Sequence, residues 1–314
     1  MSLAVSGKSP AVLLLVFNRP EQTELMLEAI KKAGTSSLYV ACDGPRLDKP
    51  DDAAKVQAVR RLIEDIDWCT VRTNFRQTNL GCGRAVSDAI TWFLSEAEEG
   101  IILEDDCLPD TTFFSFCAEM LERYRHDTKV MQIAGFNFLG ESCDHSCDYL
   151  FSNFGWQWGW ATWRRAWQKF DLKMTDWPRF KAMGLHRQFP FYKERVEVFD
   201  LVYGGSIDTW DYQWHFAMAA HSGISVVPSV NLVKNLGFGC GTHSTSAAGF
   251  ERYNVKVRPM SFPLKHCDFV YADRQYDDRL VKAVCSLPLG VRLVRKAARI
   301  YRRFRPKSGG AACG

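Results

Sequence analysis

Three consecutive carboxylates, Glu104, Asp105 and Asp106, end a short apolar run that begins at Gly100. If this run is a strand of an open α/β sheet, the three residues lie at its carboxyl end, where such sheets bind their ligands. Crowded acidic groups repel one another, so a positive group is expected to neutralise them. Mg²⁺ and Mn²⁺ bind carboxylate oxygens and complete their shells with substrate phosphates. This acidic triad therefore predicts a divalent-metal site, and a solvated acidic loop is the alternative.

The elements that must position the triad alternate between strands and helices. Apolar runs of strand length lie at 11–17, 38–42, 69–73, 101–103, 130–134 and 225–230. The segments between the first five runs predict helices at 20–32, 51–65, 84–96 and 111–125, and the first of these has Leu25, Leu27 and Ile30 available for a buried face. Such alternation predicts an α/β fold with a doubly wound, mostly parallel sheet.

The second half of the chain has a different composition. Eight of the ten tryptophans lie between Trp156 and Trp214, where no clear periodicity is visible. We expect this half to be irregular, with loops and short helices. The expected division is a first half at 1–135, a second half at 136–285 and a basic tail at 286–314.

The first half lacks the usual glycine-rich turns that bind phosphates. Neither G-x-G-x-x-G nor G-x-x-x-x-G-K-[ST] occurs in the first 110 residues, so the dinucleotide fingerprint and the P-loop are both excluded there. A nucleotide-type sheet that ends in carboxylates instead suits a nucleoside diphosphate held through a metal ion.

Length and composition indicate a globular protein. The 314 residues are 46% hydrophobic and 24% charged, which is ordinary for this class. No run approaches the roughly 18 apolar residues of a membrane span, and the run at 11–17 is too short for a signal peptide. We expect a cytoplasmic protein, and the eleven scattered cysteines favour reduced thiols.

Positive charge is concentrated near the end of the chain. Residues 290–307 carry eight lysines and arginines and no acid, and without these eight charges the net charge of +4 becomes −4. Apolar residues lie among the basic ones from 289 onward, so residues 289–307 could form a helix on the inner membrane surface. A solvated helix end is the alternative, and nothing in the remainder of the chain supports nucleic-acid binding.

Several short motifs, in order, resemble the GT-A glycosyltransferases. The closer similarity is to the N-acetylglucosaminyltransferase I family and to bacterial family-2-like nucleotide-diphospho-sugar transferases. The matching landmarks span about residues 11 to 215 and are the acidic triad followed by Phe113-Phe114, Gly159-Trp160 followed by Trp167, Trp177-Pro178, and Trp210-Asp211. This chain departs from the family in its Trp167 to Trp177 spacing and in reading Trp-Asp-Tyr-Gln-Trp at the last motif. We also expect no membrane anchor of the kind that eukaryotic Golgi members carry.

The resemblance implies roles for the donor side of the site. Asp106 would bind the metal, Mn²⁺ or Mg²⁺, while Glu104 and Asp105 would contact the ribose and the sugar. Uracil and ribose would bind at the ends of the first two strands, at Phe17, Asn18, Arg19 and Asp43. An aspartate can accept a hydrogen bond from uracil N3–H, but Arg19 could instead pair with a carboxylate and Asp43 could simply form its turn.

Three further residues are candidates for the diphosphate. Arg84 follows Gly81 and Gly83 at the start of a predicted helix, where its charge and the helix N-terminus both favour an anion. Asn79 would shape the preceding turn. His243, in a glycine-rich loop, would close over the diphosphate or complete the metal shell, and a structural role is the alternative.

Two carboxylates compete for the role of general base. An inverting transfer needs a carboxylate opposite the leaving group to take the proton of the acceptor hydroxyl. By the resemblance this residue is Asp211, and Asp208 is the competitor. A helical segment would place both on one face, whereas Asp208 would also suit the N-cap of that helix.

The tryptophans are candidates for the acceptor site. Aromatic rings suit the flat apolar face of a sugar, and we expect Trp158, Trp160 and Trp210 to contact the acceptor. Core packing is the alternative for at least half of the tryptophans between 156 and 163.

Together these expectations predict a metal-dependent, inverting glycosyltransferase, transferring a hexose or an N-acetylhexosamine from a UDP-sugar to a glycan or lipid-linked acceptor. The first half would bind the nucleotide sugar, and the second would supply the acceptor site and the base. A sugar-phosphate nucleotidyltransferase is one alternative, but that class has a glycine-rich loop where this chain has Asn18-Arg19-Pro20. A non-catalytic carbohydrate-binding protein is the other, and it leaves the acidic triad unexplained.

Overall fold

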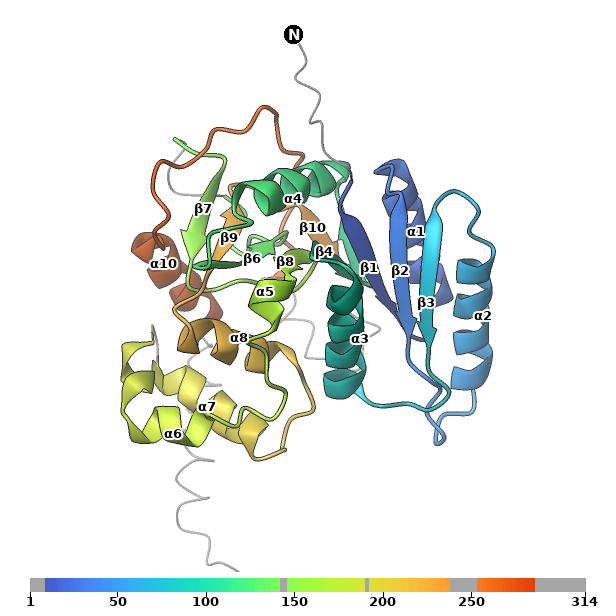
Figure 1. The fold of residues 1–314 in the computed structure, drawn as a ribbon, viewed down its shortest axis with the longest axis horizontal. Coiled ribbons are helices and arrows are strands. Elements are labelled where there is room, and N and C mark those ends of the chain that lie inside the picture. The colour runs from blue at the N-terminus through green and yellow to red at the C-terminus, as the bar shows by residue number, and fades with distance from the viewer. Residues whose placement is uncertain (1–8, 142–145, 190–191, 238–252, 286–314) are drawn as a thin grey trace, which may run out of the picture.

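The fold is built on one sheet of eight strands in the order β3-β2-β1-β4-β8-β6-β9-β7 (Figure 1). The computed structural model describes residues 9–141, 146–189, 192–237 and 253–285. Six strands run in one direction, and only β8 and β7 are reversed. The strands are β1 (Ala11–Val16), β2 (Ser37–Cys42), β3 (Thr70–Phe75), β4 (Glu99–Glu104), β6 (Val130–Ala134), β7 (Tyr149–Ser152), β8 (Trp160–Trp163) and β9 (Ile224–Pro228). The predicted α/β fold with a mostly parallel sheet is confirmed.

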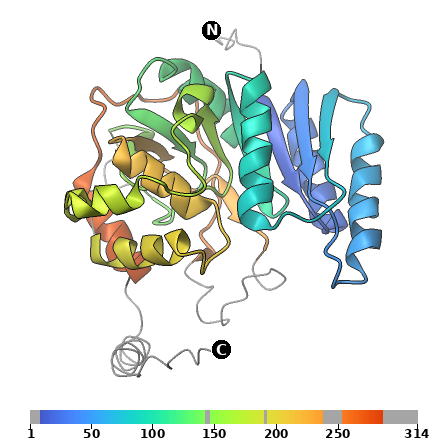
Figure 2. The ribbon, with the colours of Figure 1, turned by 60° about the horizontal axis from the view of Figure 1, so that its bottom comes forward.

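Helices cover both faces of the sheet, because alternate side chains of its buried strands point in opposite directions. Val12, Leu14 and Val16 of β1 belong to the core under α1 (Pro20–Lys32), α2 (Asp52–Glu64) and α4 (Thr111–Arg123). Leu13 and Leu15 belong to the core under α3 (Cys82–Glu96), α5 (Arg164–Trp167) and α8 (Asp211–Ala220). Figure 2 shows α3 in front of the sheet. The doubly wound arrangement is therefore also confirmed.

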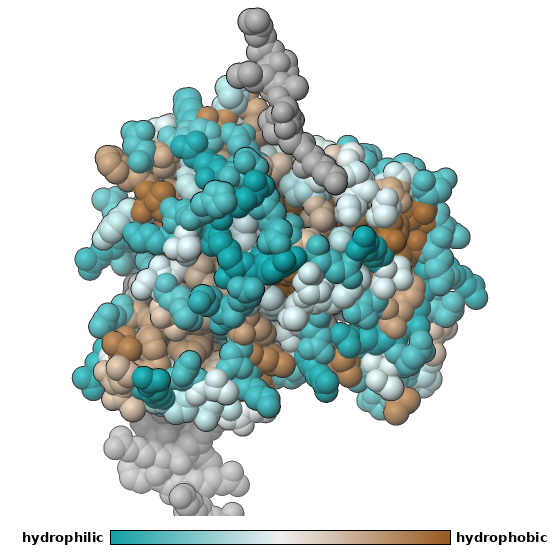
Figure 3. Space-filling view, in the orientation of Figure 1, coloured by the Kyte–Doolittle hydropathy of each residue, from teal (hydrophilic) through white to brown (hydrophobic). Residues whose placement is uncertain are grey.

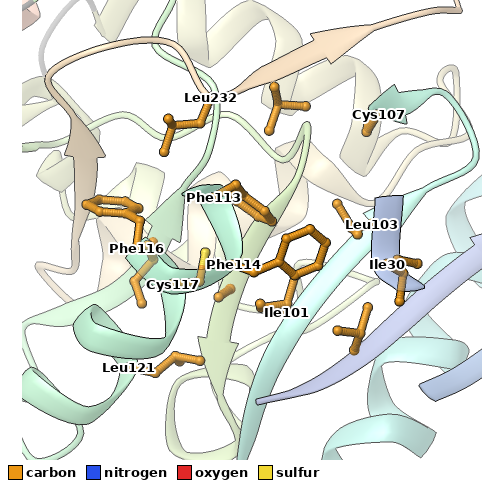
Figure 4. Packing of buried hydrophobic residues seen from close by; sticks show 14 of the residues in the cluster. Ile30, Ile101, Leu103, Cys107, Phe113, Phe114, Phe116, Cys117, Leu121 and Leu232 are labelled. Atoms are coloured by element: carbon orange, nitrogen blue, oxygen red, sulfur yellow. The ribbon is translucent and has the colours of Figure 1, made fainter. Parts of the chain in front are cut away.

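Aromatic residues of α4 form much of the first core. Phe113, Phe114 and Phe116 are buried, and Phe113 and Phe114 lie on the side of α4 toward Ile101 and Leu103 of β4 (Figure 4). Asp110 caps this helix by accepting a hydrogen bond from the Thr112 N–H at 2.9 Å. The packing fixes the strand whose last residue is Glu104.

The buried face of α1 differs from the prediction. Thr23, Met26 and Ile30 are its buried residues, whereas Leu25 is 46% exposed. Met26 and Ile30 are four residues apart and share one helical face, which leaves Leu25 outside that stripe.

The second half contributes strands and short helices to the same fold. β8 lies between β4 and β6 and is antiparallel to both, so the boundary at residue 135 falls within one sheet. The helices α6 (Trp177–Ala182), α7 (Tyr192–Tyr203) and α8, with a 3-10 turn at Leu185–Gln188, lie together at the lower left of Figure 1. Finally, β10 (Val233–Asn235) pairs antiparallel with β5 (Cys107–Pro109), and α10 (Arg274–Cys285) lies beside β7.

The face shown in Figure 3 carries hydrophobic atoms in separate patches within a largely hydrophilic surface. Such scattered exposure is normal for a protein surface. Within the described ranges, every helix is too short or too polar to cross a bilayer. The basic residues 289–307 lie outside the described residues.

Candidate active site

The carboxyl ends of three neighbouring strands meet at one edge of the sheet. β2, β1 and β4 are adjacent and parallel, with Leu15 of β1 in register with Glu104 of β4. Arg19 follows β1, Asp43 follows β2, and the acidic triad ends and follows β4. The topology therefore brings these predicted residues to one place.

Arg19 supplies a positive charge beside the acidic triad. Its Nη1 donates to Asp105 Oδ1 at 2.7 Å and to Asp106 Oδ2 at 3.0 Å. Arg19 thus pairs with carboxylates, which was the alternative to donor binding. Asp105 is only 5% exposed. Its burial raises its pKa to about 6, although the nearby Arg19 charge opposes this.

Glu104 is the triad member with the least compensation. Burial raises its pKa well above the ordinary value, and the charges of Asp106, Asp105 and Asp211 raise it further, against the lowering effect of Arg19. No hydrogen bond to its carboxylate is found within the described residues. A single guanidinium among three carboxylates leaves negative charge uncompensated in a desolvated place, where an added cation is favoured.

The residues near Asp106 fit a metal ion that is held largely by its substrate. Within the described ranges, no group of three or more His, Cys, Asp or Glu side chains is arranged to hold a metal by itself. Mg²⁺-type sites commonly use one or two carboxylates together with substrate phosphates. The carboxylates of Asp106 and Glu104 would serve as such ligands, with the diphosphate completing the shell.

The chain that follows β10 passes directly over Asp106. The Leu236 N–H donates to the Asp106 carbonyl at 2.6 Å, and a Cβ atom on Gly237 would lie 2.3 Å from Asp106 Oδ2. A larger residue here would have to displace the Asp106 carboxylate. The next segment contains His243, which lies outside the described residues, so its predicted role stays a prediction.

Asp211 lies near the triad, although it belongs to a distant part of the chain. It is the first residue of α8, and its Oδ1 accepts hydrogen bonds from Thr209 Oγ1 and, at 2.9 Å, from the Tyr212 N–H. Its charge contributes to the raised pKa of Glu104. The structure thus brings the expected base and the expected metal site together.

Asp208 has a different task. Its Oδ1 accepts from the Gly83 N–H at 3.0 Å, so it satisfies the N-terminus of α3. Cβ atoms on Gly81 and Gly83 would lie 2.7 and 2.6 Å from its carboxylate oxygens. The expectation of a cap was right in kind but wrong about the helix, because α8 begins only at Asp211 with Trp210 as its N-cap. For the same reason Asp208 and Asp211 do not share a helical face.

The loops after β1 and β2 are fixed by polar contacts. The Asn18 amide donates to Asp52 Oδ1 at 2.7 Å, and Arg46 Nε donates to Asp52 Oδ2 at 2.6 Å. Arg46 also lies over the Phe17 ring, 5.3 Å from its centroid. Asn18 therefore has a structural partner in addition to its predicted place near the donor.

Asp43 and Asn79 join two loops. Asp43 Oδ1 accepts from the Gly44 N–H at 2.9 Å, and its Oδ2 accepts from the Leu80 N–H at 3.0 Å. Asn79 donates to the Gly44 carbonyl at 2.9 Å and accepts from the Gly81 N–H at 3.2 Å, which is the predicted turn-shaping role. A carboxylate has about four acceptor sites, so Asp43 retains capacity for a ligand.

Arg84 is exposed on α3, and its ion-pair partner is Asp88, with 3.5 Å between Arg84 Nε and Asp88 Oδ2. The helix itself begins at Cys82, two residues before the predicted start. Desolvation raises the pKa of the Cys82 thiol to about 12, with smaller contributions from Glu104, Asp208 and Asp211. The N-terminus of α3 therefore borders the acidic residues, and the phosphate role of Arg84 stays a prediction.

Two of the three predicted acceptor tryptophans are core residues. Trp160 is 0% exposed and Trp210 is 3% exposed, and their rings stack at a centroid distance of 5.7 Å. Neither has a ring face for a sugar, so their assignment to the acceptor was wrong. Trp158 is partly exposed and lies in an aromatic group with Phe136, Trp156 and Tyr253.

Three polar residues near Asp211 were not foreseen. Tyr212 is 37% exposed, and His215 lies one helical turn after Asp211 on α8. Tyr253, from a distant segment, lies close enough to raise the pKa of Tyr212, which burial and Asp211 raise more strongly. Once residues 211–220 are recognised as a helix, the four-residue spacing of Asp211 and His215 already places the two side chains on one helical face.

The sequence matches no protein-family profile and no curated protein. Among solved structures, the chain is similar to a mannosyltransferase from Pyrobaculum calidifontis in complex with GDP-Man and Mn²⁺, with 14% identity, a TM-score of 0.47, and coverage of 79% of this chain and 61% of that one. It is also similar to HddC from Yersinia pseudotuberculosis, with 14% identity, a TM-score of 0.31, and coverage of 50% and 77% respectively. This chain thus spans less than two thirds of the mannosyltransferase. The function proposed below is built on the residues of the site.

Proposed function

We propose that this chain is a metal-dependent glycosyltransferase that moves a sugar from a nucleoside-diphosphate donor to a hydroxyl group of a glycan or lipid-linked acceptor. The observation that carries the proposal is the acidic triad at the carboxyl end of β4, with Asp211 of α8 near enough to raise the pKa of Glu104. Ligands of open α/β sheets bind at this edge. The residue motifs shared with GT-A glycosyltransferases add support.

The donor would lie along the ends of β1, β2 and β4. Asp43 retains acceptor capacity for a base N–H, and we propose a uracil nucleotide, whose N3–H is such a donor. Arg19, between Asp105 and Asp106, would stay near the diphosphate and hold the triad in place. A divalent ion held by Asp106 and Glu104 would supply charge neutralisation for the departing nucleoside diphosphate.

Asp211 would act on the acceptor. Its Oδ1 is held by Thr209 and by the Tyr212 N–H, which leaves Oδ2 to take the proton of the attacking hydroxyl. A base opposite the leaving group produces inversion at the sugar carbon. We therefore propose an inverting mechanism, with a hexose or N-acetylhexosamine as the transferred group.

The place of action follows from the acceptor. Polysaccharide or glycoconjugate assembly at the cytoplasmic face of a membrane would suit a lipid-linked acceptor. The eight basic residues between 292 and 307 would bind an anionic lipid surface. A liposome sedimentation assay with and without these residues would test this part separately.

A thermal-shift panel tests the donor site. UDP, GDP and their sugars are measured with and without Mn²⁺, because a ligand that binds only the native state raises Tm. The proposal expects a shift with at least one nucleoside diphosphate or its sugar that requires the metal. No shift with any nucleotide would contradict it, and metal-independent binding of glycans alone would favour a carbohydrate-binding protein.

A further inference from the structure

A chain of buried amides beneath α8 begins at Trp214. The Trp214 indole N–H donates to Gln132 Oε1 at 2.7 Å, and Gln132 Nε2 donates to the Trp156 carbonyl at 3.1 Å. Gln132 is fully buried. An indole N–H can only donate, so it fixes which end of the Gln132 amide is the oxygen.

The orientation of the Gln132 amide in turn determines the orientation of the Gln157 amide. Gln157 Nε2 donates to Gln132 Oε1 at 3.2 Å and to the Gly155 carbonyl at 3.0 Å. A reversed Gln157 amide would face both acceptors with its own oxygen. A Cβ atom on Gly155 would lie 2.3 Å from Gln132 Nε2, so glycine is required beside this network.

The last member of the chain is His215. Its Nε2 lies 3.1 Å from Gln157 Oε1. Because that oxygen can only accept, His215 Nε2 must carry a hydrogen. Burial lowers the pKa of His215 to about 4, and Arg195 lowers it further, while Asp211 and a hydrogen bond to the Gly155 backbone oppose this, so the ring is neutral near pH 7. The other nitrogen, Nδ1, is then a bare acceptor.

His215 lies close to Asp211 on α8. The residue is one turn after Asp211 on α8, so the two side chains share a helical face. The Tyr212 ring lies beside it at a centroid distance of 6.3 Å. The residue as a whole is partly exposed. The acceptors found for its ring among the described residues are Gln157 Oε1 and the Gly155 backbone, and both take the hydrogen of the one N–H nitrogen of the neutral ring.

We propose that His215 Nδ1 accepts a hydrogen bond from a second hydroxyl of the acceptor sugar, next to the hydroxyl that Asp211 deprotonates. This inference rests on the proposed function. Sugars carry hydroxyls on adjacent carbons, so one residue can activate one group while its helical neighbour holds the next. His215 is then a specificity-determining residue that selects acceptors with a donor beside the reacting hydroxyl.

The first test observes the ring directly. Nitrogen NMR of the full chain labelled with ¹⁵N-histidine reports which nitrogen is protonated. We expect a neutral Nε2–H form at pH 7, and a shift of the Nδ1 resonance when a methyl glycoside from a panel of common hexoses and N-acetylhexosamines is added. A protonated Nδ1, or an Nδ1 resonance that no glycoside moves, would overturn the inference.

Two substitutions separate contact with the acceptor from support of the network. In His215→Asn the side-chain oxygen can take the place of Nδ1, whereas His215→Gln keeps a polar group near Nε2 and loses the Nδ1 position. We expect His215→Gln to raise the acceptor KM roughly tenfold, the effect of one lost hydrogen bond, with an unchanged donor KM. His215→Asn should recover most of this loss, and the opposite order would assign His215 to the network alone.

Failure of the two proposals can be told apart. If the wild-type chain transfers no sugar from any nucleotide donor, the proposed function fails. The glycoside titration of the wild-type Nδ1 resonance still decides whether His215 contacts a sugar.

Discussion

Asp208 and Asp211 are three residues apart, yet their surroundings give them separate tasks. Asp208 accepts the Gly83 N–H and so belongs to the start of α3, while Asp211 starts α8 and its charge raises the pKa of Glu104. The sequence pattern could not separate them, because the partner that occupies Asp208 is 125 residues away. The difference in contacts makes the two carboxylates a matched pair for mutation.

Asp211→Asn should bind donor normally and lose transfer by about 10²- to 10⁴-fold, because general-base catalysis contributes that much. Asp208→Asn is the control. Asn and Asp cap helices about equally well, so this variant should keep the contact to the Gly83 N–H and retain both stability and transfer per folded molecule. Steady-state transfer assays combined with urea unfolding measure both effects. Full activity of Asp211→Asn would place the base elsewhere.

Asp106→Asn should abolish the dependence of nucleotide binding on Mn²⁺, since it removes the carboxylate charge at the proposed metal site. The measurement is the Tm shift with nucleoside diphosphate, with and without the metal. Asp48→Asn, at an exposed carboxylate outside the triad, should behave like the wild type. A metal-dependent shift of normal size in Asp106→Asn would remove Asp106 from the metal site.

At the scale of elements, Asp52 holds together the end of β1, the loop after β2 and the start of α2. Arg46, aided by Asn18 and against the effect of burial, lowers the pKa of this 3% exposed carboxylate to about 2. A lowered carboxylate pKa stabilises the fold above the unfolded value of about 4 and loses this contribution as the pH falls through 2. The contacts that Asp52 makes between these three segments should therefore weaken in acid.

Asp52→Asn should lower the free energy of unfolding by about 2 kcal/mol at pH 7, and by roughly half as much at pH 3. Urea unfolding at the two pH values measures the difference. Asp51→Asn is the matched control, because Asp51 is exposed and its side chain does not cap α2. An equal loss at both pH values would show that the ion pair is not the source.

The strands and helices of the first half could be predicted because each carries its own pattern. Runs such as 11–17 are continuously apolar and end in polar residues, and they became β1 and its neighbours. β8 was not predicted, since four residues flanked by tryptophans resemble the loops around them. Its strand character comes from β4 and β6, which contact it from distant parts of the chain.

The same distinction applies to the site. The acidic triad and Asp211 could be found as short motifs. The network of Gln132, Gln157 and His215 could not, because it is defined by side chains that meet only after folding. Trp160 and Trp210 were misassigned because an aromatic residue in the sequence does not show whether its ring is buried.

At the scale of the molecule, both halves belong to one sheet. β8 pairs with β4 through Ala161 and Ile101, and with β6 through Ala161 and Ile133. The proposed donor residues of the first half follow strands of this sheet, and α8, which begins with Asp211, leads into β9 of the same sheet. A rigid frame of this kind suits a reaction between two bound substrates.

The shared sheet should make unfolding a single cooperative transition. Tryptophan fluorescence reports mainly on residues 156–214, where eight of the ten tryptophans lie, whereas far-ultraviolet circular dichroism reports on all elements. The two urea transitions should coincide. Separate midpoints would show that the halves unfold independently despite the shared sheet.

The most direct test of the central claim is the product formed from a nucleotide sugar. The chain is incubated with Mn²⁺, a UDP- or GDP-sugar and a panel of methyl glycosides, and the products are identified by mass spectrometry. A glycosyltransferase should release nucleoside diphosphate and form a longer glycoside, and both products should disappear in Asp211→Asn. A parallel incubation contains a nucleoside triphosphate and a sugar phosphate instead. Formation of a nucleotide sugar and pyrophosphate there, with no glycoside product in the first incubation, would contradict the account and identify a nucleotidyltransferase.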